Sequence, residues 1–238
     1  MARRRFFVPY VRDGHAEIAG EHARHLTQVL RVETGQVFEI SDNSAAYVAE
    51  ISAVDKTHVT FHVLERLPDP PQEVPVHLVV ALFKFDRLEL LLEKATELGV
   101  TSIQFVRAER SDKGLDQAAE KRMERWRRIV VEASQQSRRL RSPELLPPVR
   151  LHEAVAWQPD SCRLFLDEER TGLPLLDAIP QPAKAVSLMI GPEGGWTEQE
   201  RAMAREAGWT SVSMGTHILR AETAGIAALA VVDAVSHR

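Results

Sequence analysis

The chain has 238 residues, of which 44% are hydrophobic and 27% are charged, and its formal net charge is −4. This composition is ordinary for a globular protein, is sufficient for one core or for two small domains, and gives no sign of disorder. No apolar run is long enough to span a bilayer and the first residues lack the apolar stretch of a secretory signal, so we expect a cytoplasmic protein without a membrane partner.

The single cysteine limits the chemistry open to the chain. Because Cys162 is the only cysteine, the chain cannot form an intrachain disulfide, and a cysteine-rich metal site is not expected. It begins an apolar strand candidate, where a small buried side chain is expected rather than a nucleophile. His22 and His25 form a poor zinc site. We therefore expect no bound metal.

A compact, mostly β domain with one helix is predicted for the first part of the chain. The apolar spacing in Glu21–Arg31 predicts the helix. Strands are predicted at Gln36–Ser41 and Tyr47–Val54, and the alternation from Val59 to Val63 predicts a third. Four prolines between Pro68 and Pro75 disfavour both helix and central strand. We place the domain boundary there, which divides the chain into domains 1–71 and 72–238.

Strand and helix patterns alternate after the boundary, which predicts a mainly parallel α/β sheet with helices on both faces. A capping box is predicted at Asp86 with Glu89, and a second at Thr197 with Glu200. The predicted strands are Val76–Leu82, Ser102–Val106, Arg163–Leu166, Ala185–Ile190 and Thr210–Met214, and the predicted helices run from Asp86 to Gly99, Glu120 to Ser137, Thr197 to about Gly208, and Ala221 to Ser236.

The last helix is apolar almost all the way round, so it must be buried on more than one side. Two explanations remain open. The helix is a core element of its own chain, or it packs against a second copy in a homodimer.

Positive charge is concentrated between Lys121 and Arg141. This segment has eight basic and two acidic residues, a local balance of +6, so the rest of the chain carries −10. Such a field favours a polyanionic partner, and arginine suits phosphate contacts. The alternative is a solvated helix face, although two acids cannot neutralise eight bases.

The glycine-rich segment Gly191–Trp196 follows an apolar strand candidate. Glycine lets the backbone approach a ligand closely, but the segment matches neither phosphate-binding glycine motif. Glu193 would repel a pyrophosphate and would suit a ribose hydroxyl or a cation, so a nucleoside is the favoured ligand. A tight turn without a ligand is the alternative.

Three predicted strand ends carry candidate binding residues. They are Leu166–Asp167, Ile190–Trp196 and Met214–Arg220. Ligands of open parallel sheets bind beyond the carboxyl ends of the strands, so these segments converge on one site if their strands are neighbours.

Six motifs together resemble those of the bacterial 16S ribosomal RNA N3-methyluridine methyltransferases of the SPOUT superfamily. They are His25 with Val29-Leu30-Arg31, Glu93–Val100, Glu109–Ser111, Glu132–Arg138, Gly191–Gly195 and Leu219–Ala224. The resemblance runs from about His22 to the C-terminus.

The resemblance implies a SPOUT-type α/β domain with a deep trefoil knot, preceded by a PUA-like RNA-binding domain. It further implies S-adenosylmethionine as methyl donor, a homodimer, and 16S rRNA of the small ribosomal subunit as partner. General topology rules make knots essentially absent, so the knot rests on the resemblance alone. The implied cofactor-binding residues are Leu166, Ile190, Gly191, Pro192, Glu193, Gly194, Met214, Gly215, Ile218, Leu219, Thr223 and Ala224.

The implied reaction is direct methyl transfer to N3 of a uridine, which needs no cysteine nucleophile. Arg220 is the candidate to stabilise the uridine anion or to hold its phosphate. Glu222 is the weaker candidate for proton acceptor, and a carboxylate favoured by the helix dipole is its alternative role. The expected RNA contacts are Arg3, Arg4, Arg5, Arg12, Arg24, Arg31, Arg110, Arg138, Arg139 and Arg141. Two alternatives are a SPOUT methyltransferase acting on another RNA and a non-catalytic RNA-binding protein that keeps the fold.

Overall fold

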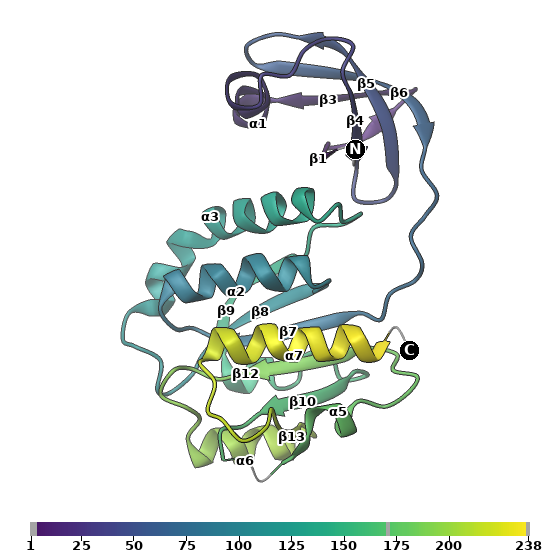
Figure 1. The fold of residues 1–238 in the computed structure, drawn as a ribbon. Coiled ribbons are helices and arrows are strands. Elements are labelled where there is room, and N and C mark those ends of the chain that lie inside the picture. Colours follow the sequence, from purple (N-terminus) through teal and green to yellow (C-terminus); the bar gives the residue numbers. More distant parts are fainter. Residues whose placement is uncertain (1–3, 170–171, 237–238) are drawn as a thin grey trace. The chain divides into compact units, whose positions relative to one another are not determined.

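The structure, a computed structural model, describes residues 4–169 and 172–236. The chain forms two compact units, traced in Figure 1. The first unit comprises Met1–Pro71 and Ser134–Ser142, and the second comprises Gln72–Ala133 and Pro143–Arg238. No pattern in the sequence predicts that Ser134–Ser142 belongs to the first unit.

Hydrogen bonds explain why Ser134–Ser142 belongs to the first unit. Ser41 Oγ donates to the carbonyl of Leu140 at 2.6 Å, and Arg5 Nη1 donates to the carbonyl of Arg138 at 2.6 Å. Arg141 Nε donates to the carbonyl of Asn43 at 2.9 Å.

The first unit is built on a six-stranded sheet with the order β1-β4-β5-β6-β3-β2. The strands are β1 (Arg5–Phe7), β2 (Val11–Arg12), β3 (His15–Ala19), β4 (Val37–Ser41), β5 (Ala46–Val54) and β6 (His58–Arg66). Only β1 and β4 pair in parallel. The sequence missed β1 to β3 because turn residues such as Asp13 and Gly14 interrupt any apolar alternation.

The helical segment predicted at Glu21–Arg31 is shorter in the structure than predicted, and it changes from an α-helix to a π-helical turn. It consists of α1 (Gly20–Arg24) and a π-helical turn, η1 (His25–Val29). Ala23 and Leu26 are buried, as the spacing requires, in a core that includes Ile40, Ile51 and Phe61 of the sheet.

The second unit contains a seven-stranded sheet whose pairings are all parallel, in the order β11-β13-β10-β12-β7-β8-β9. The strands are β7 (Val76–Ala81), β8 (Ser102–Arg107), β9 (Glu144–Arg150), β10 (Cys162–Leu166), β11 (Leu173–Pro174), β12 (Val186–Ile190) and β13 (Thr210–Ser213). The sequence missed β9, which contains Pro147 and Pro148, because proline is confined to edge strands, and β9 lies at an edge.

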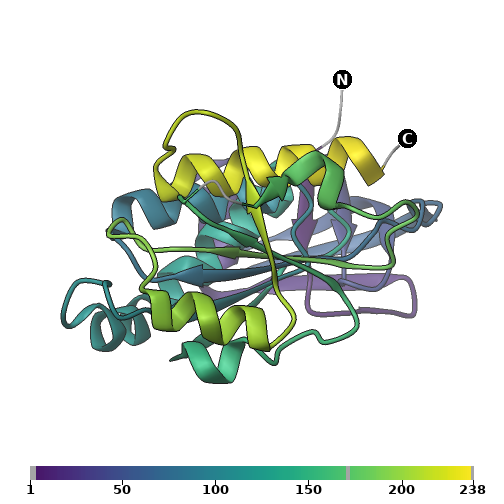
Figure 2. The ribbon, with the colours of Figure 1, turned by 90° about the horizontal axis from the view of Figure 1, so that it is seen from below.

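Helices cover both faces of this sheet, and Figure 2 shows α7 and α6 on opposite sides. The helices are α2 (Phe85–Glu97), α3 (Leu115–Gln136), α4 (Leu151–Ala154), α5 (Leu175–Ala178), α6 (Glu198–Glu206) and α7 (Ala221–Ser236). Residues of α2, α3 and α7 share one core with the sheet, and residues of α4 and α6 share the other. No helix among the described residues is long and apolar enough to cross a membrane.

The two predicted capping boxes have different outcomes. Thr197 and Glu200 form the predicted box at the start of α6, with Glu200 N donating to Thr197 Oγ1 at 3.3 Å. The prediction at Asp86 is wrong, because α2 begins one residue earlier, at Phe85. The ring centroids of Phe85 and Trp126 lie 5.5 Å apart. Glu89 binds Arg122 and Arg125 of α3 instead.

One face of α7 is buried within its own unit. Gly225, Ala228, Leu229 and Val232 face the core, whereas Val231 remains half-buried. An internal core role therefore accounts for one side of the helix.

We expect the stability of the second unit to depend on His77, which lies buried in β7 with its Nδ1 2.7 Å from Ser102 Oγ. Burial lowers the pKa of His77 from the ordinary 6.5. The unfolded chain then binds the proton at higher pH than the folded chain. The stabilisation is therefore complete above pH 6.5 and is lost as the pH falls through the folded-state pKa.

Denaturant unfolding at about pH 7.5 and about pH 5.5 measures this dependence. His77→Gln should lose less stability over that interval than the unsubstituted protein. Equal losses would contradict a role for His77.

Candidate functional site

Three neighbouring strands end at one cavity. Strands β13, β10 and β12 are adjacent and parallel, so their carboxyl ends meet at one edge of the sheet. The segments that follow them line a cavity of about 430 Å³. The convergence predicted from the sequence therefore occurs. Most of the lining residues come from these segments: Leu166, Asp167, Glu168, Ile190 to Trp196, Val212 to Gly215, and His217 to Ala221.

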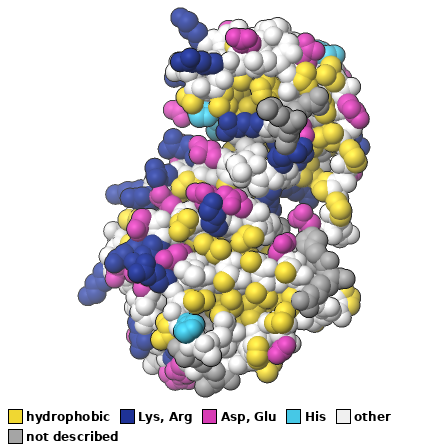
Figure 3. Space-filling view, in the orientation of Figure 1, with side chains coloured by type: hydrophobic (Ala, Val, Ile, Leu, Met, Phe, Trp, Pro, Cys, Tyr) yellow, Lys and Arg dark blue, Asp and Glu magenta, His cyan; other side chains and the backbone are white. Residues whose placement is uncertain are grey.

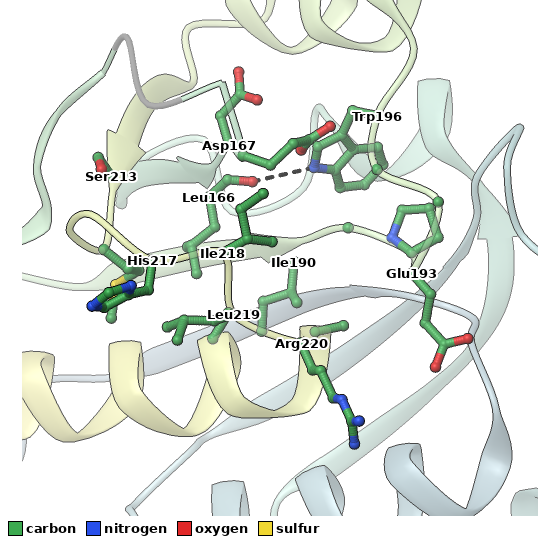
Figure 4. Close-up of a pocket in the computed structure, with 18 of the residues that line it drawn as sticks. Leu166, Asp167, Ile190, Glu193, Trp196, Ser213, His217, Ile218, Leu219 and Arg220 are labelled. Atoms are coloured by element: carbon green, nitrogen blue, oxygen red, sulfur yellow. Dashed lines mark hydrogen bonds between the residues drawn. The ribbon is translucent and has the colours of Figure 1, made fainter.

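The cavity has an apolar middle and two polar ends, which Figure 4 shows. Leu166, Ile190 and Leu219 form the apolar part. Glu193 and Arg220 lie at one end, and His217 lies toward the other. Arg87 of α2 also lines the cavity and forms an ion pair with Glu193.

The glycine loop is shaped mainly by packing. Trp196 is fully buried, and its Nε1 donates to the carbonyl of Leu166 at 3.3 Å. A Cβ at Gly191 would lie 2.7 Å from that nitrogen, so no side chain fits there. Only Gly195, with φ of 70°, needs the freedom of glycine in its backbone. The loop is thus a tight turn and also a wall of the cavity.

Arg110 holds the glycine loop from outside. Its Nη1 donates to the carbonyls of Gly194 at 3.1 Å and Trp196 at 3.3 Å. The sequence predicted Arg110 as an RNA contact, whereas the structure places its guanidinium against this loop.

Arg201 of α6 holds the segment after β10. Its side chain is 7% exposed and binds Asp167, itself 5% exposed, at 3.1 Å. It also pairs with Glu168 at 2.6 Å and Glu169 at 3.0 Å. Burial opposes the charge, but the hydrogen bond and charge of Asp167 and the two glutamates raise the pKa of Arg201. The cavity wall at Asp167–Glu168 is therefore fixed by a permanent cation behind it.

Of the predicted cofactor-binding residues, Thr223 alone does not line the cavity. Thr223 is exposed on α7, whereas Ala221 and Ala224, which are three residues apart and share a helix face, line the cavity. Cofactor binding by the lining residues stays a prediction.

The two predicted catalytic residues differ in position. Arg220 lines the cavity, is exposed, and has no acidic partner among the described residues. Glu222 does not line the cavity and is 6% exposed in the first turn of α7. Its position agrees with the alternative role, a carboxylate favoured by the helix dipole, and the role of proton acceptor stays a prediction.

Some of the predicted RNA-binding arginines bind other groups of the protein, and others are exposed. The prediction for Arg5 is wrong, because its buried guanidinium binds Glu39 at 2.8 Å and the carbonyl of Arg138. Arg138 also pairs with Glu39, and Arg141 binds Asn43. Arg139 is half-buried. Arg3 lies outside the described residues, and Arg4, Arg12, Arg24 and Arg31 are exposed.

Exposed positive charge remains along α3. Figure 3 shows Lys and Arg side chains protruding where this helix begins. Arg122 and Arg125 bind Glu89, and the hydrogen bond from Arg125 lowers the pKa of Glu89. Lys121 and Arg128 are exposed and have no such partner among the described residues. The two lie seven residues apart, on one face of the helix.

The sequence analysis missed two arginines of the site, Arg87 in the cavity lining and Arg201 behind the cavity wall. Arg87 carries the clearest signal, because it follows β7, the neighbour of β12 in a parallel sheet, and strand ends of such sheets carry ligand contacts. Arg201 carries no such signal, since a buried arginine cannot be told from a surface one by its spacing alone.

Cys162 lies at the other end of β10 from the cavity. Its Sγ donates to the carbonyl of Ala178 at 3.6 Å, and burial raises the pKa of the thiol. The side chain has the character of a structural residue, as the sequence predicted.

Two family models match the chain. An RNA methyltransferase domain matches residues 70–233, and an RNA methyltransferase PUA domain matches residues 18–64. The chain is 31% identical over 206 residues to ribosomal RNA small subunit methyltransferase E of Aquifex aeolicus, covering 86% of this chain and 88% of the relative.

Two solved structures share the fold. The ribosomal RNA small subunit methyltransferase E of Neisseria gonorrhoeae, bound to S-adenosyl methionine, is 34% identical with a TM-score of 0.86, covering 96% of this chain and 95% of that one. A methyltransferase of Legionella pneumophila in complex with the cofactor SAM is 30% identical with a TM-score of 0.90, covering 98% of both chains. These likenesses confirm the expected fold class, a SPOUT-type trefoil-knot α/β domain preceded by a PUA-like domain.

We expect Arg201→Met to destabilise the second unit by about 3–5 kcal/mol, because it leaves Asp167 buried without its partner. Arg205→Met, four residues on in α6, removes only the exposed pair with Glu198 and should cost about 0–1 kcal/mol. Denaturant unfolding of both variants measures the difference. Similar small losses would show that Arg201 does not fix the cavity wall.

Proposed function

This chain belongs to the RNA methyltransferase family, and on that premise we propose that it transfers a methyl group from S-adenosylmethionine to N3 of a uridine in the small-subunit ribosomal RNA. The observation that carries the proposal is the cavity at the ends of β10, β12 and β13. It joins an apolar wall to a charged end where Arg220 has no acidic partner among the described residues.

The cavity fits the proposed methyl donor. Its volume of about 430 Å³ lies within the range of small-molecule sites. Leu166, Ile190 and Leu219 provide an apolar surface for an adenine ring, and the glycine loop brings backbone groups to the same wall. Glu193 supplies a carboxylate at the charged end, which suits a positively charged ligand group. When bound, the donor supplies an electrophilic methyl group on a sulfonium.

Arg220 stabilises the nucleophile. Uridine N3 reacts as an anion, because its proton must pass to solvent water before the nitrogen can attack. The guanidinium of Arg220 and the N-terminal turn of α7, which follows directly, both favour negative charge at this place. Because N3 attacks the methyl carbon directly, no thiol is required, which agrees with the position of Cys162.

RNA contacts are assigned to both units. The match to a PUA domain supports RNA binding by the first unit through Arg4, Arg12, Arg24 and Arg31. On α3 we assign them to Lys121, Arg127 and Arg128, which are exposed. We further propose a homodimer that covers the half-buried side of α7, including Val231.

Arg220→Ala should lower methyl transfer by about 10²–10³-fold while leaving cofactor binding nearly unchanged, because Arg220 acts on the developing anion. In a strain without the gene, nucleoside analysis of small-subunit rRNA should show the loss of one 3-methyluridine. A plasmid copy should restore it, and an Arg220→Ala copy should not. An rRNA that keeps all its 3-methyluridine without the gene would point to another RNA. Full restoration by the Arg220→Ala copy would remove Arg220 from the mechanism.

Lys121→Glu with Arg128→Glu should weaken binding to small-subunit rRNA and lower the slope of log affinity against log salt, by about 1 for each phosphate that the protein no longer neutralises. Lys184→Glu makes the same charge change as either single substitution, at an exposed site before β12, at the opposite end of the strand from the cavity, and should leave the slope unchanged. Filter binding over a salt series measures both. If the two substitutions lower affinity no more than Lys184→Glu, the RNA binds elsewhere.

A further inference from the structure

Arg87 is the only arginine of the described cavity lining, apart from Arg220, and it is held by two carboxylates. Its guanidinium forms an ion pair with Glu193 of the glycine loop. Its Nε also lies 3.9 Å from Glu222 Oε1 of α7. Arg87 is therefore poised between one carboxylate that lines the cavity and one that does not.

Glu222 is incompletely paired in this arrangement. Its side chain is 9% exposed, and its Oε2 is buried without a hydrogen-bond partner among the described residues. A buried carboxylate oxygen without a donor is unfavourable, and among the described residues Arg87 is the cation that forms an ion pair with Glu222. The two carboxylates thus compete for a single guanidinium.

The backbone around Arg87 is fixed. Helices α2 and α7 pack closely, since a Cβ at Gly225 of α7 would lie 2.8 Å from Leu91 of α2 and 2.7 Å from Ile190. A change of partner by Arg87 therefore needs only rotation of its own side chain, which has several rotatable bonds, is 28% exposed, and is already within 4 Å of Glu222.

We propose that Arg87 stands in for the positive charge of the cofactor at Glu193 and moves to Glu222 when the cofactor binds. This inference rests on the proposed function, which brings a sulfonium to the cavity. A cation that enters beside Glu193 releases Arg87, and Arg87 then donates to Glu222 Oε2. Arg87 is a positioning residue in this scheme, because it acts through Glu193. Glu193 keeps a positive partner in both states, and Glu222 gains a hydrogen bond from Arg87 when the cofactor binds, so a buried carboxylate becomes fully paired.

The inference predicts opposite effects for two substitutions. Arg87→Met removes the competitor for Glu193 and should tighten S-adenosylmethionine binding at least about threefold, since the site is no longer blocked for part of the time. Glu222→Gln removes the charge that receives Arg87 and should weaken that binding. Neither should change the affinity for 5′-methylthioadenosine, a neutral thioether that carries the same adenosine. Calorimetric titration of both ligands measures these effects.

Two further variants separate the proposal from simpler effects. In a Glu193→Gln background, Arg87→Met should no longer tighten S-adenosylmethionine binding, whereas a general effect of removing positive charge would persist. Arg87→Lys keeps a cation and should bind S-adenosylmethionine more like the unsubstituted protein than Arg87→Met does, and thermal unfolding shows whether each variant is folded.

Equal changes for the charged and neutral ligands, or weaker S-adenosylmethionine binding in Arg87→Met, would overturn the inference and leave the proposed function intact. Failure of the unsubstituted protein to bind S-adenosylmethionine would overturn the proposed function and this inference together.

Discussion

The site depends on the side-by-side arrangement of β13, β10 and β12, whose carboxyl ends lie at one edge of a parallel sheet. Strand pairing alone leaves the segments beyond these ends free to move. Two arginines remove that freedom from outside the cavity. Arg201 binds the three acids that follow β10, and Arg110 binds two carbonyls of the glycine loop after β12. Apolar side chains thus form the middle of the cavity. The buried ion pairs of Arg201 and the hydrogen bonds from Arg110 to backbone carbonyls hold its walls in place.

Charge is distributed unevenly around this cavity, and the distribution follows the proposed chemistry. The apolar middle suits a heterocyclic base, whereas Glu193, Arg87 and Arg220 gather at one end. The proposed reaction joins a positively charged sulfonium and a negatively charged uridine. The carboxylate of Glu193 suits the sulfonium, and the guanidinium of Arg220 suits the uridine anion. Arg220 needs no acidic partner because it is exposed to water.

The sequence predicted the elements that have strong periodicity and clear ends. It placed α7 at its observed bounds and identified Thr197 as the cap of α6, because apolar repeats and capping residues are local signals. The sequence did not predict strand β9, because prolines are tolerated only in edge strands and the order of strands in the whole sheet decides which strand lies at an edge. The cavity residues of the three strand ends were predicted because parallel topology brings them together. The sequence did not predict the roles of Arg5, Arg201 and Arg87, since each arginine pairs with an acidic residue that is distant in the sequence.

The most direct test of the account is transfer of a labelled methyl group from S-adenosylmethionine by the purified protein to small ribosomal subunits, and to free rRNA, from a strain without the gene. We predict label in one uridine of the rRNA, recovered as 3-methyluridine. A protein that binds S-adenosylmethionine and rRNA but transfers no label to either substrate would contradict the account and would identify a non-catalytic RNA-binding protein that keeps the fold.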